Sequence, residues 1–191
     1  MRLRTGISLG LACALVLAAG GVAAGLYDLD ENEASGPAQP IDFSHKKHAG
    51  ELGIQCLYCH TAADKSQSAT VPAVSVCMGC HQWVKKGASP GSEQEIAKIG
   101  AYLRRGESIP WIRVHNLPEY VQFKHQPHVR HPFSCQTCHG PVQEMNRVWL
   151  VPDTRYSPSS AFLPARKLEM GWCVDCHEKN QGPRGCVACH Y

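Results

Sequence analysis

Ten of the eleven cysteines form five pairs in which two residues separate the partners, and a histidine follows each pair at once. The pairs are Cys56/Cys59, Cys77/Cys80, Cys135/Cys138, Cys173/Cys176 and Cys186/Cys189, and the histidines are His60, His81, His139, His177 and His190. Two thiols at this spacing can each form a thioether to one vinyl group of the same porphyrin, and the adjacent histidine is then held under the iron. The motif therefore predicts five covalently bound haem c groups with five proximal histidines.

Two other chemistries also use paired cysteines. Cys-x-x-Cys units build tetrahedral zinc sites, and ten cysteines in an exported chain can form five disulfides. Neither chemistry requires a histidine directly after the second cysteine of each pair. The sequence has this histidine in all five cases, and the one cysteine outside the pairs, Cys13, belongs to the apolar N-terminal stretch. The pattern favours covalent haem over zinc or disulfides.

Six histidines remain outside the motifs: His45, His48, His115, His125, His128 and His131. A haem that transfers electrons gains from a second strong axial ligand, because six-coordinate iron changes little in geometry between Fe(III) and Fe(II). The spacing His-x-x-His in His45/His48 and in His125/His128 puts two imidazoles on one helical turn, within reach of two adjacent haems. We predict these four histidines to be distal ligands.

The fifth distal ligand has several candidates. His115 is the first, and Met170, which precedes the motif at Cys173, is the second. A thioether ligand at that haem would raise its reduction potential relative to its neighbours. His131 and Met145 are weaker candidates.

The segment Phe-x-His-x-x-His occurs twice, at Phe43 and at Phe123, each time shortly before a haem motif. One further motif follows the first copy, and two follow the second. This self-similarity predicts a modular chain. The expected parts are a membrane anchor at 1–27, a linker at 28–40, a dihaem module at 41–91, a helical connector at 92–122 and a trihaem module at 123–191.

The elements that position these motifs have to be short. From residue 41 onward, the chain must wrap five porphyrins, which leaves little room for a core made of protein alone. We therefore expect mainly short α-helices and irregular coil wrapped around the haems, and no large sheet. The connector should contain one longer helix: Ser92 and Glu95 fit a capping box, Ile96, Ile99, Gly100 and Leu103 share one face, and Gly106 is a natural stop.

The N-terminal stretch predicts that the protein is anchored in a membrane. The segment from Ile7 to Tyr27 is long and apolar enough to cross a bilayer as a helix. Arg2 and Arg4 precede them and acidic residues follow, so the haem region should lie on the periplasmic side of the cytoplasmic membrane. A signal peptide cleaved after 22–24 and a lipoprotein attached through Cys13 are alternatives.

The net charge of +3 discriminates little between functions, since ten haem propionates would offset many basic residues. Nucleic-acid binding has no support, because the basic residues are scattered and form no recognised motif.

The motifs together resemble a known family. Phe-x-His-x-x-His followed by Cys-x-x-Cys-His resembles the class III cytochromes of the c3 and c7 type. The segments "FSHKKHAGELGIQCLYCH", "PWIRVHNLPEYVQFKH", "CQTCHGPVQEM" and "MGWCVDCH" are similar to the membrane-anchored pentahaem subunit of alternative complex III. One departure from that pattern is His131, in "HVRHPFSC".

The resemblance implies a role in electron transport. In such complexes, integral-membrane subunits and an iron–sulfur subunit oxidise a quinol, and the pentahaem chain relays electrons to a monohaem cytochrome c or an oxidase. The chain itself would then be a non-catalytic subunit rather than an enzyme. Alternatives are a stand-alone quinol dehydrogenase that feeds periplasmic reductases, and a multihaem reductase with an open iron.

Overall fold

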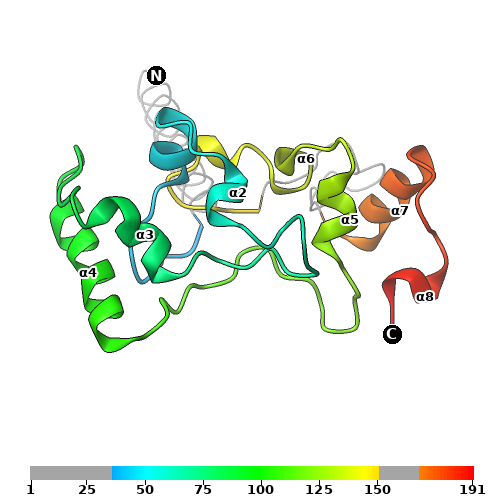
Figure 1. Ribbon diagram of the computed structural model, residues 1–191. Helices are drawn as coiled ribbons and strands as arrows, with labels where there is room; N and C mark the ends of the chain where they lie inside the picture. The colour runs from blue at the N-terminus through cyan, green and yellow to red at the C-terminus, as the bar shows by residue number, and fades with distance from the viewer. Residues whose placement is uncertain (1–35, 151–167) are drawn as a thin grey trace, which may run out of the picture. The chain divides into compact units, whose positions relative to one another are not determined.

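The computed structural model describes residues 36–150 and 168–191, and the described residues from Pro37 onward belong to one compact unit. Short helices joined by long coil segments make up this part of the chain (Figure 1). It contains no strand, only an isolated antiparallel bridge between Val121 and His190. The helices are η1 (Lys46–Glu51, a π-helix), α2 (Cys56–Cys59), α3 (Val74–His81), α4 (Ser92–Arg105), α5 (His125–Arg130), α6 (Cys135–His139), η2 (Val142–Glu144, a 3₁₀ helix), α7 (Met170–Lys179) and α8 (Cys186–Cys189).

Each Cys-x-x-Cys-His motif lies within a short helix or at its end. The helices α2, α6 and α8 contain little besides the motif itself, and the residue before each of them, Gln55, Ser134 or Gly185, has an extended backbone. Helices of four or five residues are too short to be stable alone in water. Their stability must therefore come from contacts with the rest of the folded protein and with whatever the two cysteines bind.

The longest described helix, α4, confirms most of what the sequence predicts for the connector. It ends at Gly106, whose backbone is left-handed with φ of 67° and whose N–H donates to Leu103 and Tyr102. The capping box, however, is wrong. Ser92 is the first helical residue rather than the cap, and its hydroxyl donates to the carbonyl of Gly87. The Glu95 carboxylate instead pairs with Lys98 and accepts the backbone N–H of Asp42, outside the helix.

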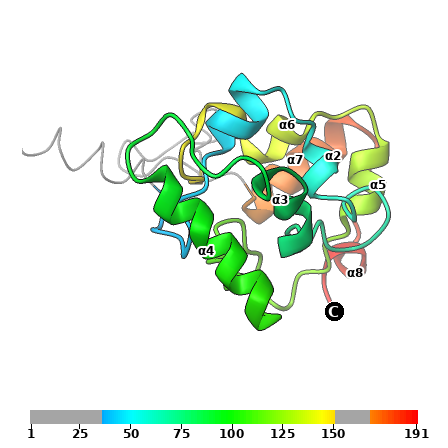
Figure 2. The ribbon, with the colours of Figure 1, turned by 60° about the vertical axis from the view of Figure 1, so that its left-hand side comes forward.

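The protein-only core is small, as expected for a chain that wraps large cofactors. A cluster of buried apolar side chains sits where α3 packs against α4 (Figure 2). Its members are Ile41, Val74, Ile99 and Ile109, with Cys77, Met78, Tyr102 and Trp111 packed around them. Within the described ranges no large side chain is completely buried. This part of the protein therefore depends little on a conventional hydrophobic core.

The first copy of the repeat is held through η1, which packs against η2. The backbone N–H of Lys46 donates to the carbonyl of Met145 at 2.9 Å. A Cβ placed on Gly50 would lie 2.3 Å from the carbonyl oxygen of Gln143, so only glycine permits this approach. The segment that precedes the first motif is thus fixed by the chain that follows the third.

The predicted membrane anchor, 1–27, lies outside the described residues, as does most of the linker. Among the residues that are described, no helix has the length and apolarity needed to cross a bilayer.

Candidate functional site

The two copies of Phe-x-His-x-x-His adopt the same local geometry. The Phe43 ring meets His45 edge-on, at 4.9 Å between centroids and 89° between planes, and stacks on His48 at 4.4 Å and 25°. Phe123 repeats this arrangement, at 4.8 Å and 86° with its first histidine and 4.5 Å and 32° with its second. Each phenyl ring thus orients two imidazoles at once. The sequence analysis used these phenylalanines to detect the repeat but assigned them no role at the site.

The second histidine of each copy faces the histidine of a later motif. His48 lies opposite His81, with ring centroids 6.1 Å apart, and His128 lies opposite His177, at 6.0 Å. The first histidine of the second copy, His125, faces the motif that follows it, and its ring is 6.4 Å from that of His139.

These separations are those of two axial ligands on one metal. Two imidazoles that bind one metal from opposite sides hold their centroids about 6 Å apart, because each metal–nitrogen bond is about 2 Å long and each centroid lies about 1 Å behind its nitrogen. All three facing pairs fall within this range. The donor sets therefore fit haem iron with one imidazole above and one below.

The first histidine of the first copy completes the pattern. Burial, followed by the nearby imidazoles of His60 and His48, lowers the pKa of His45 to about 4. Its ring is therefore neutral at pH 7, with a lone pair available for a metal, and its neighbour His60 belongs to the motif that follows directly. Each histidine of the two repeats is thus next to one motif histidine.

Hydrogen bonds fix which ring nitrogen can bind a metal. In seven of these imidazoles Nδ1 lies within hydrogen-bond distance of a backbone carbonyl, which can only accept, so Nδ1 must carry the proton and Nε2 the lone pair. Such bonds orient metal-binding histidines and raise their basicity. The donors, with their acceptors and N···O distances, are His48 (Ser44, 2.8 Å), His60 (Thr70, 2.7 Å), His81 (Val84, 3.0 Å), His125 (Gln67, 3.0 Å), His128 (Lys124, 2.7 Å), His177 (Pro183, 2.5 Å) and His190 (Tyr120, 3.2 Å).

The state of the cysteines can be compared with the two rival chemistries. None of the ten motif cysteines is joined to another in a disulfide. Across residues 36–150 and 168–191, no three side chains of histidine, cysteine, aspartate or glutamate converge as a tetrahedral zinc site would require. A haem needs only one or two axial ligands from the protein, because the porphyrin supplies the other four. The facing pairs of imidazoles are arranged as such axial ligands would be.

Neighbouring thiols show which attachment sites are adjacent. Burial and then the nearby Cys59 raise the pKa of Cys77, so the first and second motifs are neighbours. Burial raises the pKa of the Cys135 thiol, and the nearby thiol of Cys56, which is hydrogen-bonded with it, raises this pKa further. The third motif is therefore a neighbour of the first. Burial and then Cys189 raise the pKa of Cys173, which joins the fourth motif to the fifth.

The third and fourth motifs are linked through α5 instead of through thiols. His125 and His128, one turn apart on this helix, face His139 and His177 respectively. The five Cys-x-x-Cys-His motifs therefore follow one another in space in the order second, first, third, fourth, fifth. This order differs from the order of the motifs in the sequence.

A close approach at His177 was not predicted from the sequence. A Cβ on Gly182 would lie 2.8 Å from Cγ of the imidazole, and the N–H of Gly182 donates to the carbonyl of His177 at 2.7 Å. A glycine five residues after a histidine is too common in protein sequences to indicate such a close approach by itself.

The candidates for the fifth distal ligand are dispersed. His115 lies edge-on to His139, at 4.4 Å and 71°, too close for a metal to fit between the two rings. His131 stacks on Phe133 at 4.3 Å. Met145 is buried, with 5% of its surface exposed, whereas Met170 is 69% exposed at the start of α7.

Two comparisons with known proteins bear on this site. Residues 121–191 match the family model described as cytochrome c7 and related cytochrome c. The chain is also 28% identical over 198 residues to the menaquinone reductase multihaem cytochrome c subunit of Nitratidesulfovibrio vulgaris, an alignment that covers 95% of this chain and 87% of that protein. The chain is thus similar to the c7-type cytochromes over residues 121–191 and to a multihaem cytochrome c subunit over most of its length.

Proposed function

We propose that the chain binds five haem c groups and relays electrons as a subunit of a quinol-linked membrane complex of the alternative complex III type. The observation that carries the proposal is the unbroken row of five attachment sites, in which each site neighbours the next through thiols or through one turn of α5. The similarity to a menaquinone reductase subunit supports the link to quinone chemistry.

The proposed ligands follow from the motifs and from the facing pairs. When bound, the haems supply reversible one-electron chemistry at iron. The proposed thioether residues are Cys56, Cys59, Cys77, Cys80, Cys135, Cys138, Cys173, Cys176, Cys186 and Cys189, the proximal ligands are His60, His81, His139, His177 and His190, and the distal ligands are His45, His48, His125 and His128.

The contribution of the protein is to orient these ligands. The carbonyl groups that accept Nδ1–H protons hold the rings with Nε2 directed at the iron, and the two phenylalanines of the repeat limit ring rotation. At the four sites with a distal histidine, a pair of imidazoles would keep water and substrate from the iron. An electron relay with little reorganisation on each transfer is the role that such ligation suits best.

The location and the partners are proposed from the sequence. An anchor at 1–27 would hold the haem region on the periplasmic face, next to integral-membrane quinol-oxidising subunits, an iron–sulfur subunit and a monohaem cytochrome c or oxidase as acceptor. The stretch from Ile7 to Tyr27 contains no Asp, Glu, Lys or His. Since quinol oxidation needs a proton acceptor near the membrane, this chemistry is assigned to the partner subunits.

The haem count is tested by mass spectrometry and a pyridine haemochrome assay on the purified chain. Five covalent haems are expected, and a chain without added haem mass would refute the proposal. The complex is tested by mild detergent extraction of native membranes. Iron–sulfur and polytopic membrane subunits should co-purify, whereas recovery of the isolated cytochrome would favour a stand-alone quinol dehydrogenase.

A second candidate has the same subunit role but the opposite direction of electron flow. Its support is the name of the relative, a menaquinone reductase. In proteoliposomes that contain the whole complex and a menaquinone analogue, a quinol-oxidising assembly reduces its haems on addition of the quinol form. A quinone-reducing assembly, reduced beforehand with a soluble donor, oxidises its haems on addition of the quinone form. Comparing the two initial rates decides the working direction.

A further inference from the structure

The motif at Cys186–His190 differs from the others in what its histidine faces. The described residues include all eleven histidines. The ring of His190 stacks on that of Tyr120, with 5.8 Å between the centroids and 27° between the planes. The backbone carbonyl of Tyr120 accepts the proton of His190 Nδ1, which leaves Nε2 for a metal. No ring contact in the described ranges sets a second imidazole opposite His190.

The two spare histidines are engaged elsewhere. His115 lies beside His139, whose opposite face is already covered by His125. The ring of His131 is stacked on that of Phe133. If the last haem is to have a sixth ligand from a side chain, a residue other than histidine must supply it.

Met170 offers a suitable group, because its thioether is a known axial ligand of c-type haems. The side chain is 69% exposed, although methionine usually packs inside proteins. The other methionines of the described residues are used in packing: Met145 is buried and Met78 packs against the core cluster. Packing therefore does not account for Met170.

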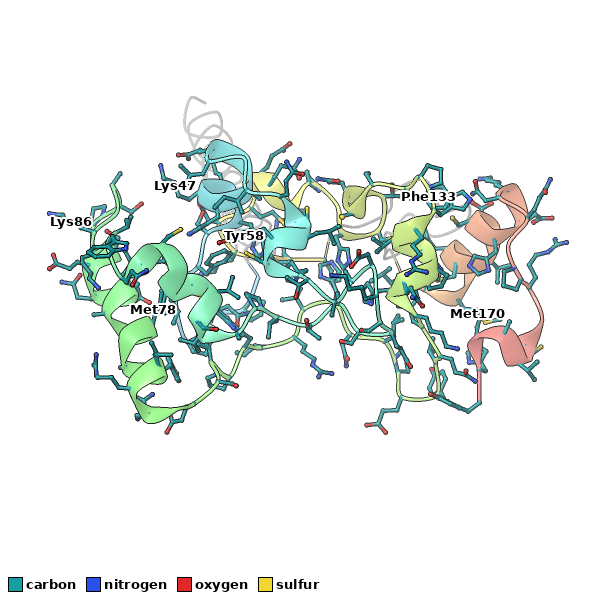
Figure 3. The ribbon with its side chains drawn as sticks, in the orientation of Figure 1. Lys47, Tyr58, Met78, Lys86, Phe133 and Met170 are labelled. Atoms are coloured by element: carbon teal, nitrogen blue, oxygen red, sulfur yellow. The ribbon has the colours of Figure 1, made fainter. Side chains whose placement is uncertain are left out.

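The position of Met170 points toward the last motif. It is the first residue of α7, and Cys173 follows three residues later on the same face of the helix. Cys173 neighbours Cys189, the second cysteine of the last motif. In Figure 3 the Met170 side chain extends from the start of α7 on the side where α8 lies.

The haem that is closest to Met170 in the sequence has no position left for it. That haem belongs to His177, and His128 faces His177 at 6.0 Å with only 30° between the planes. Both axial positions of that site are therefore taken by imidazoles. The other motif that neighbours this face of α7 is the one at Cys186 and Cys189, since Cys173 on the same face interacts with Cys189.

We propose that Met170 Sδ is the sixth ligand of the iron at Cys186/Cys189, opposite His190. The inference rests on the proposed function, since it requires haem at this motif. Because a thioether stabilises Fe(II) relative to an imidazole, this haem would have the highest potential of the five. It also lies at one end of the row of sites. The haem with the highest reduction potential would thus lie at the end of the row formed by the last motif.

The test uses the purified full-length holoprotein and its variant Met170→Leu, which keeps the volume but removes the sulfur. Ferric protein should show the far-red charge-transfer band of thioether-ligated haem, and the variant should lose it. One haem in five should also become high-spin and bind carbon monoxide. In Met170→His, that haem should stay low-spin while its potential falls toward those of the others.

Met145→Leu is the matched control, because it removes a buried thioether, and it should leave the band unchanged. Retention of the band in Met170→Leu, or its absence from the wild-type protein, overturns the proposal. Conversion of one haem to high spin by His115→Ala but not by Met170→Leu overturns it in favour of His115. The haem count distinguishes a failure of the proposed function from a failure of the ligand assignment. Fewer than five covalent haems would contradict the proposed function, whereas five haems without the band would contradict only the assignment of Met170.

Discussion

The imidazole planes of His125 and His139 lie within 8° of parallel, although the two residues come from different helices and face each other across 6.4 Å. The corresponding angle is 30° between His128 and His177 and 58° between His48 and His81. The angle between two axial imidazole planes decides how the d orbitals of ferric iron split. The three sites are therefore built to be spectroscopically different.

We expect this difference in the electron paramagnetic resonance spectrum of the oxidised protein. The site of His125 and His139 should give an ordinary rhombic low-spin signal, and the site of His48 and His81 should give the most anisotropic signal of the three. Replacing His125 with alanine should remove a rhombic component. Loss of the most anisotropic component instead would show that the ring planes are arranged differently.

His128→Ala should open one axial position at the haem of His177, because these two rings face each other at 6.0 Å. One haem in five should then become high-spin and bind carbon monoxide in the ferrous state. The control is His131→Ala, three residues away, because this exposed ring stacks on Phe133 instead of facing a motif histidine. Identical spectra for the two variants would contradict the pairing.

Phe123→Ala should loosen two ligands at once, since this ring contacts both His125 and His128. Each aromatic contact contributes about 0.5–1.5 kcal/mol, so the loss in unfolding free energy should be about 1–3 kcal/mol. The low-spin signals of the third and fourth sites should broaden. Phe133→Ala is the control because Phe133 stacks on His131, and it should leave these signals sharp. Chemical denaturation and paramagnetic resonance measure the two effects.

Gly182→Ala should displace the proximal histidine of the fourth site. The new methyl group would lie 2.8 Å from Cγ of His177, whose ring is held by the carbonyl of Pro183. Such overpacking costs about 1–3 kcal/mol. Gly185→Ala is the control, because nothing lies within 4 Å of its Cβ position. A lower melting temperature and an altered low-spin signal are expected only for the first variant.

Two glycines of α4 should respond oppositely to alanine. Gly106 closes the helix at φ of 67°, a conformation that costs alanine about 1–2 kcal/mol. Gly100 is inside the helix, where alanine is favoured by up to about 1 kcal/mol, and its Cβ would meet only the flexible end of Arg104 at 3.4 Å. Melting temperatures should fall for Gly106→Ala and hold or rise for Gly100→Ala. A fall of equal size in both variants would contradict this account.

The sequence predicted the local features well because their causes are local. The cysteine spacing and the adjacent histidine define each motif within five residues. The helix α4 follows from the period of its apolar side chains and from Gly106. The repeat could be recognised because Phe43 and Phe123 stand at equal distances from their histidines, and the structure shows these two segments with matching ring geometry.

The failure at Ser92 also has a local origin. Its sequence context fits a capping box, but the helix begins one residue earlier than a capping residue allows, and the hydroxyl binds the carbonyl of Gly87. In the turn before the helix, the backbone N–H of Gly87 donates to the Ser92 oxygen at 3.0 Å and so takes the place of the helix N–H that a cap would accept. A pattern of four residues cannot show which of two partners an oxygen will choose.

The sequence by itself determined which residues have the type and spacing to bind haem: the thiol pairs for the porphyrin, and the histidines beside them and the two histidine pairs of the repeat for the iron. Tertiary structure alone decided which imidazole stands opposite which and how the five motifs follow one another. The reason is physical. A ligand set is a matter of chemical type and short spacing, whereas its pairing depends on contacts between segments as distant as Cys56 and Cys135, which only the folded chain brings together.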